Sequence, residues 1–125
     1  MIEEKNFSGN KCDLEEAYHI YKEGRRLANI TEWSKAKEYH ENAANIFVAN
    51  NKLDWASRSF GRVAFNAFDL KESIAHIEDI LSKANEYDKW QGTANYYWML
   101  EHCGAKETAD FIVSLVKQYP KIDFS

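Results

Sequence analysis

The residues whose chemistry and spacing stand out in this chain are arginines and asparagines that recur four positions apart. Arg58, Arg62 and Asn66 follow one another at that interval, which places them on one face of a helix. Arg25 and Asn29 repeat part of this pattern earlier in the chain. A guanidinium group binds a carboxylate through two parallel hydrogen bonds, and an Asn side chain can hold a peptide backbone. The pattern therefore indicates a surface for acidic or peptide-like groups.

The alternative is a solvated face whose arginines pair with nearby acids. Glu23 precedes the first arginines, but the stretch 53–68 around Arg58 and Arg62 contains no Glu and only Asp54 near its start. These two arginines need counter-charge from elsewhere in the fold or from a partner. The sequence leaves both interpretations open.

Groupings typical of enzymes are weak. Glu16 and His19 have the spacing of one ligand pair of a di-iron site, but the second pair and the two further Glu residues of such a site are missing. His102 and Cys103 are adjacent, so on a helix their side chains point about 100° apart and do not face each other as base and nucleophile. The sequence therefore predicts no enzyme, no metal site and no cofactor. A small enzyme is an alternative only if a deep pocket brings His40 or His102 beside Cys103 or a carboxylate.

The composition favours a helical protein. The 125 residues suffice for one domain, and five Gly and one Pro are too few for the many turns of an all-β fold. A net charge of −4 argues against a nucleic-acid-binding surface. No apolar run approaches the roughly 20 residues that cross a bilayer, and the N-terminus lacks an apolar signal core. We expect free thiols at Cys12 and Cys103 and a cytoplasmic chain that binds no membrane.

Apolar residues recur with helical spacing in six stretches. A short acidic or hydroxyl side chain opens several of them, at Asp13, Thr31, Asp54 and Asp88. Leu70 is assigned to the fourth helix, Gly104 to the turn after the fifth, and Pro120 to the end of the sixth. The predicted helices span about 13–29, 32–49, 54–68, 70–84, 88–103 and 105–119.

An internal repeat relates these helices in pairs. In the second helix of each pair, residues align at offsets of 37 and 36 positions: Ala36 with Ser73 and Ala109, His40 with Ile77 and Val113, and Ala43 with Ile80 and Val116. In the first helices Gly24 matches Gly61. A mid-helix Gly costs about 1 kcal/mol relative to Ala, so its recurrence indicates a close approach of two helices.

With these residues the chain resembles the tetratricopeptide repeat family. That family has a small residue at the positions of Gly24 and Gly61, Ala at the positions of Ala36 and Ala43, and Pro at the end of a repeat, as at Pro120. The second hairpin departs from the pattern at Ser73 and Ile80, and the third at Tyr97 and Val116. The resemblance covers about residues 14–120.

The resemblance implies an all-α fold of three antiparallel helix hairpins, stacked as a short right-handed superhelix. The hairpins would span about 13–50, 53–86 and 88–120, with an N-terminal arm at 1–12 and a tail at 121–125. A compact six-helix bundle is the alternative architecture, because short loops between helices of this length also produce one.

In such a stack the first helix of each hairpin lines the concave face. The resemblance places there Tyr18, Tyr21, Arg25 and Asn29 from the first hairpin, Trp55, Arg58, Arg62, Phe65 and Asn66 from the second, and Trp98, Glu101 and His102 from the third. This set predicts a protein–protein interaction module that binds an acidic peptide or protein segment. Trp55 and Trp98 could equally belong to the core.

An alternative function is a small inhibitor of the immunity, antitoxin or anti-defence type, which blocks a partner protein. The last predicted helix carries several apolar residues, so we expect the tail or a second copy of the chain to cover it. A homodimer is therefore one of the assemblies that the sequence allows.

Overall fold

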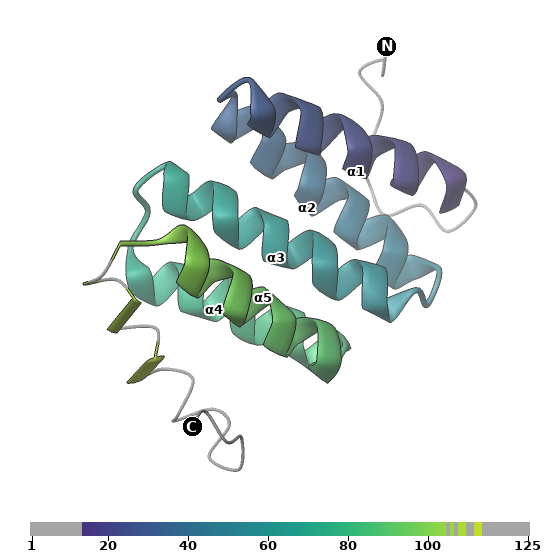
Figure 1. Ribbon diagram of the computed structural model, residues 1–125. Helices are drawn as coiled ribbons and strands as arrows, with labels where there is room; N and C mark the ends of the chain where they lie inside the picture. Colours follow the sequence, from purple (N-terminus) through teal and green to yellow (C-terminus); the bar gives the residue numbers. More distant parts are fainter. Residues whose placement is uncertain (1–13, 105, 107, 110–111, 114–125) are drawn as a thin grey trace.

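The computed structural model describes residues 14–104, 106, 108–109 and 112–113, and over these residues the chain is all-α without strands. Its helices are α1 (Leu14–Asn29), α2 (Trp33–Ala49), α3 (Leu53–Asp69), α4 (Ile74–Tyr87) and α5 (Lys89–His102). Each helix packs antiparallel to the one before it. In Figure 1, α1, α3 and α5 lie in the nearer layer, with α2 and α4 behind them.

The first three loops share one conformation that accounts for their short length. Each contains a residue with positive φ: Thr31 at 62°, Asn51 at 58° and Lys71 at 64°. The next residue donates its backbone N–H to a carbonyl five positions earlier, as Glu32 does to Leu27 at 2.9 Å, Lys52 to Phe47 at 2.9 Å and Glu72 to Ala67 at 3.0 Å. These are Schellman closures, which satisfy the last carbonyls of a helix and reverse the chain at once.

The predicted helix starts are correct in part. Asp88 caps α5, because its Oδ1 accepts a hydrogen bond of 2.8 Å from the backbone N–H of Gln91. Thr31 was predicted to cap the second helix, but it is the left-handed residue that ends α1, and its side chain caps nothing. Leu70 was predicted within the fourth helix, but it is the C-cap of α3 and is exposed. α3 begins at Leu53, which places Asp54 in its first turn.

The predicted repeat of the second helices holds at some positions and fails at one. His40 and Ile77, aligned at an offset of 37, are both buried in α2 and α4. Ala36 is buried inside α2, but its predicted equivalent Ser73 is the N-cap of α4, where its hydroxyl accepts a hydrogen bond from His76 N–H. α4 therefore lacks the first turn that α2 has, because Ser73 stops the helix from extending backward.

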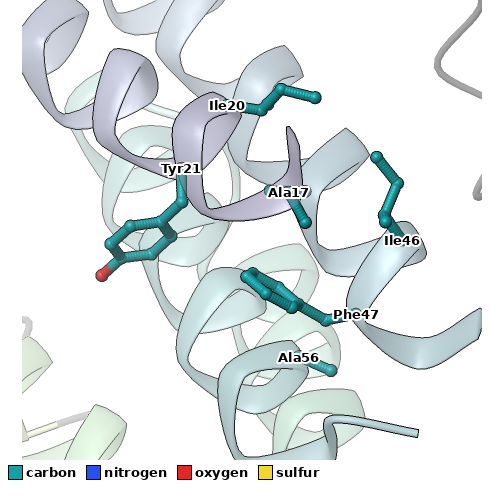
Figure 2. Packing of buried hydrophobic residues seen from close by; sticks show 7 residues of the cluster. Ala17, Ile20, Tyr21, Ile46, Phe47 and Ala56 are labelled. Carbon is teal, nitrogen blue, oxygen red and sulfur yellow. The ribbon is translucent and has the colours of Figure 1, made fainter. Parts of the chain in front are cut away.

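Small side chains let the helices of the core lie close together. One cluster joins α1, α2 and α3 and contains Ala17, Ile20, Tyr21, Ala43, Ile46, Phe47 and Ala56 (Figure 2). A second joins α2, α3 and α4 through Ala44, Phe60, Val63 and Ala84, and a third joins α3, α4 and α5 through Ala64, Ala67, Ile77, Leu81, Tyr96 and Met99. Each cluster spans three consecutive helices, so the core is continuous along the stack.

The two matched glycines of the sequence repeat both make close helix contacts, but with different partners. A Cβ on Gly24 would lie 2.8 Å from the ring of His40 in α2, the next helix. A Cβ on Gly61 would overlap the side-chain amide of Asn95 in α5. Asn95 is completely buried, donates to the carbonyl of Ser57 at 2.9 Å and accepts from Gln91 at 3.0 Å. Gly61 thus joins α3 to α5, whereas Gly24 joins α1 to α2.

Several predictions concern residues outside the described part of the chain. These are the arm at 1–12, the Asp13 cap, Cys12, Pro120 and the tail at 121–125. Of the predicted sixth helix at 105–119, the structure describes residues 106, 108–109 and 112–113, which are helical, with Ile112 and Val113 exposed. None of the described helices has both the length and the apolar character to cross a membrane.

Candidate functional site

A cleft lies where the C-terminal halves of α1, α3 and α5 meet. These three helices run in the same direction, because successive helices are antiparallel. The cleft has a volume of about 260 Å³ and is lined by Arg25, Ala28 and Asn29 of α1, Trp33 and His40 of α2, Arg62, Phe65, Asn66 and Asp69 of α3, and His102 of α5. Four of the predicted binding residues, Arg25, Asn29, Arg62 and Asn66, are therefore neighbours around one hollow.

The two Asn-containing pairs differ in how deeply they lie. Arg25 and Asn29 are exposed at the rim on α1. Asn66 is only 4% exposed, and its Oδ1 has no hydrogen-bond partner among the described residues. An unpaired amide oxygen of this kind costs about 1–3 kcal/mol. A donor from a molecule in the cleft would recover that free energy, so Asn66 is suited to accept a hydrogen bond from a ligand.

His40 forms the floor of the cleft and is neutral at physiological pH. The side chain is 1% exposed and lies under Gly24, with its ring edge-on to Tyr21 at 5.1 Å. Burial, together with the positive charges of Arg62 and Arg25, lowers the pKa of His40 to about 3. Its Nδ1 is buried without a hydrogen-bond partner in the described residues. The floor therefore contributes an uncharged polar group to a hollow whose rim is positive.

One wall of the cleft is a hydrogen-bonded pair of side chains that joins α3 to α5. His102 Nε2 lies 2.8 Å from Asp69 Oδ1, and the His102 ring stacks on Phe65 at 5.4 Å and contacts Phe68 edge-on. The carboxylate of the cleft is thus engaged by a histidine rather than by an arginine. This arrangement leaves Arg25 and Arg62 available to a molecule from outside.

Next to the cleft, Arg58 and Arg62 alternate with aromatic rings along α3 and α5. Arg58 Cζ lies 5.2 Å from the Trp55 ring and 5.5 Å from the Trp98 ring, and Arg62 Cζ lies 5.5 Å from Trp98. The Nε atoms of both arginines donate to the hydroxyl oxygen of Tyr21, at 3.0 and 3.1 Å. Figure 2 shows this hydroxyl pointing away from the apolar cluster to which the Tyr21 ring belongs. We call this group, Tyr21, Trp55, Arg58, Arg62 and Trp98, the arginine–aromatic ladder.

The ladder and the cleft carry three of the four arginines of the chain. No carboxylate of the described residues forms an ion pair with Arg25, Arg58 or Arg62. The fourth arginine, Arg26, is bound to Glu23 one turn earlier on α1. The counter-charge that Arg58 and Arg62 require by their sequence context is therefore not supplied by the described part of the fold.

Of the other predicted residues, Phe65 and His102 also line the cleft, Glu101 is exposed on α5, and the rest belong to the ladder or the core. Tyr18 lines neither the cleft nor the ladder, because its ring packs against Phe47 and Trp55, each at 5.0 Å. Trp55 serves both as a half-buried neighbour of the first core cluster and as a support for Arg58. Trp98 contacts both arginines of the ladder.

Four residues that line the cleft were not assigned to the site from the sequence: Ala28, Trp33, His40 and Asp69. The alignment of His40 with Ile77 was a usable signal, since it pairs a polar residue with a core position. Trp33 and Asp69 lie at the ends of α2 and α3, where the loop geometry decides the direction of the side chain. The described residues contain no cluster of three or more side chains suited to hold a metal ion.

Comparison with known proteins provides no family for this arrangement. A scan against models of protein families, a search of curated proteins and a search of solved structures each found no match to the chain.

Proposed function

We propose that this chain is a protein–protein interaction module that binds an acidic peptide or protein segment on the face formed by α1, α3 and α5. The observation that carries the proposal is the cleft, which combines Arg25 and Arg62, without ion pairs in the described residues, and the buried, unpaired Oδ1 of Asn66. An acidic peptide offers carboxylates to the arginines and backbone N–H groups to the asparagine. Both kinds of group are repeated along a peptide, so one segment can satisfy both.

The aromatic residues of the site suit the same ligand. Trp33, Phe65 and Trp98 are half-buried next to charged groups. Rings of this kind supply apolar contact area at little conformational cost and are enriched in protein interfaces. The cleft volume of about 260 Å³ is enough for one or two residues of a peptide, with the rest of the segment lying along the ladder.

The proposed architecture is a stack of hairpins resembling tetratricopeptide repeats, in which α1/α2 and α3/α4 are the first two hairpins and α5 opens the third. The arrangement of α1, α3 and α5 in one layer supports it (Figure 1). So does the contact between α3 and α5, which are two positions apart in the helix order. In a right-handed stack of this kind the layer of first helices would face the concave side.

The proposed function is tested by selection from a random peptide library displayed on phage. The wild-type chain should enrich sequences rich in Asp and Glu. The double variant Arg25→Ala/Arg62→Ala should lose that enrichment. Arg26→Ala is the matched control, because it removes the same charge from the neighbouring position, outside the cleft. Equal enrichment of acidic sequences by the double variant, with its helical circular dichroism intact, would contradict the proposal.

A further inference from the structure

The hydroxyl of Tyr21 brings two guanidinium groups together. One oxygen accepts from Arg58 Nε at 3.0 Å and from Arg62 Nε at 3.1 Å. Because both donors contact the same atom, the two cationic groups are neighbours. The Tyr21 side chain is 4% exposed and belongs to the core cluster of α1, α2 and α3, so the oxygen is held by the packing of the fold.

Two aromatic rings of the ladder, together with Phe65 of the cleft, lie against the same two guanidinium groups. Trp98 lies 5.5 Å from the Cζ atoms of both arginines, Trp55 lies 5.2 Å from that of Arg58, and Phe65 lies 5.6 Å from that of Arg62. Because Nε of each group is engaged by Tyr21, the donors that remain are the terminal Nη nitrogens. A long side chain fixed in this way loses little further entropy when it binds a ligand.

Two adjacent positive charges repel each other unless a negative group lies between them. Asp54 lines a small hollow of about 90 Å³ together with Trp55, Arg58 and Gln91, but it forms no ion pair with Arg58. Both arginines are half-buried, where charge interactions are stronger than in bulk water. The ladder therefore favours a ligand that carries more than one negative charge at a single point.

We propose that Arg58 and Arg62 together bind a phosphoryl group carried by a side chain of the peptide partner. A carboxylate has one charge and two oxygens, which one guanidinium fork satisfies. A phosphorylated side chain carries a charge of about −1.5 to −2 and three acceptor oxygens, so it can accept from both guanidinium groups at once. This inference rests on the proposed function, since the cleft would hold the acidic segment on which the phosphorylated residue lies.

The test uses three capped pentapeptides, with glycine at every position except the central one. The central residue is phosphoserine, glutamate or serine. Binding to the full chain is measured by titration calorimetry at constant ionic strength, and inorganic phosphate is titrated separately. We expect the phosphoserine peptide to bind at least about tenfold more tightly than the glutamate peptide, since the phosphoryl group adds charge-assisted hydrogen bonds to a second guanidinium. Equal affinity of these two peptides would overturn the inference.

Three variants identify the groups responsible. Arg58→Ala should abolish the preference for phosphoserine over glutamate. Tyr21→Phe keeps the ring in the core and removes only the shared acceptor, so it should reduce the preference about threefold to tenfold without lowering the melting temperature by more than a few degrees. Arg26→Ala is the control and should keep the wild-type preference. If Tyr21→Phe keeps it too, Tyr21 is not a positioning residue.

A spectroscopic measurement keeps the test independent of folding differences between variants. In ¹⁵N-edited spectra the Nε–Hε resonances of Arg58 and Arg62 should both shift on addition of the phosphoserine peptide, whereas that of Arg26 should not. A shift of one resonance alone contradicts a shared phosphoryl group. If inorganic phosphate binds as tightly as the phosphoserine peptide, a peptide side chain is not the source of the phosphoryl group. If the wild-type chain enriches acidic peptides but does not prefer phosphoserine, this inference alone is contradicted. If the wild-type chain shows neither property, the proposed function is contradicted as well.

Discussion

The two layers of the molecule hold their polar groups in different ways. On the layer of α2 and α4, the Glu72 carboxylate forms an ion pair with Lys37 at 2.7 Å and contacts the His76 ring at 3.1 Å, and both contacts are partly exposed to water. On the layer of α1, α3 and α5, Arg26 pairs with Glu23, but Arg25, Arg58 and Arg62 lack carboxylate partners in the described residues. Charges that compensate each other stabilise little and bind nothing, whereas uncompensated charges fixed by the core are available to a ligand.

Adjacent residues of α1 show the same difference. Arg26 pairs with Glu23, and this pairing lowers the pKa of the Glu23 carboxyl below its usual value. Arg25, one residue earlier, points to the rim of the cleft and has no such partner in the described residues. A turn of about 100° along the helix separates a self-contained surface pair from a candidate binding residue.

The largest expected effect is acid destabilisation through His40. The pKa of His40 is about 3 in the folded chain and 6.5 in the reference state, so between these values the unfolded chain binds one more proton. The contribution of the neutral His40 to the free energy of unfolding is fully present above pH 6.5. Below that pH it falls by about 1.4 kcal/mol per pH unit, or about 3 kcal/mol by pH 4.5. Urea unfolding measured from pH 7 to pH 4.5 checks this value.

The control is His40→Gln, which cannot take up a proton. At pH 5 the free energy of unfolding of this variant should change less steeply with pH than that of the wild type. The difference in slope should be about 1.4 kcal/mol per pH unit, which corresponds to one proton. Arg25 and Arg62 also face His40, and their positive charges oppose its protonation. An identical slope in the two proteins would show that the His40 site admits a proton without cost.

The next effect is steric and concerns Gly61. The substitution Gly61→Ala should destabilise the fold by about 2 kcal/mol, although Ala is the better helix former, because the new methyl group overlaps the amide of Asn95. Thermal unfolding measures this loss. In the double variant Gly61→Ala/Asn95→Ala the overlap is gone. Its loss of stability should therefore be smaller than the sum of the losses in the two single variants. Full additivity would contradict the close contact between α3 and α5.

A smaller effect distinguishes the two arginines of α1. With an acidic peptide selected from the library, Arg25→Ala should weaken binding about tenfold, because a charge-assisted hydrogen bond to the peptide is lost. Arg26→Ala should change the affinity less than twofold in buffer of physiological ionic strength, where exposed charges are largely screened. Titration calorimetry of the two variants measures the difference directly. Equal losses would indicate a general effect of net charge.

The smallest effect is expected on the layer of α2 and α4. Lys37→Ala removes a partly exposed ion pair with Glu72 and should cost about 0.5 kcal/mol or less. It should leave the affinity for acidic peptides unchanged. A loss larger than about 1 kcal/mol in chemical unfolding would mean that this ion pair fastens α2 to the loop before α4 more strongly than its exposure implies.

Helical periodicity was the reliable part of the sequence. It predicted the all-α class and the positions of α1, α2, α3 and α5 to within a few residues, because each helix buries an apolar face of its own. It failed at Thr31, Leu70 and Ser73, which lie at helix ends. There the outcome depends on backbone closures such as the positive φ of Thr31 and Lys71, and a side-chain pattern does not specify these.

By itself the sequence determined that Arg25 and Asn29, and likewise Arg62 and Asn66, share a helix face, since a spacing of four is a local property of the helix. Tertiary packing alone decided that the two pairs line one cleft, that Asn66 and His40 are buried with unpaired atoms, and that Tyr21 joins Arg58 to Arg62. The physical reason is distance along the chain. Contacts between residues about 40 positions apart depend on how closely the helices pack. Small residues such as Gly24 and Gly61 set this distance by the side chains that they contact, and the sequence does not indicate which side chains these are.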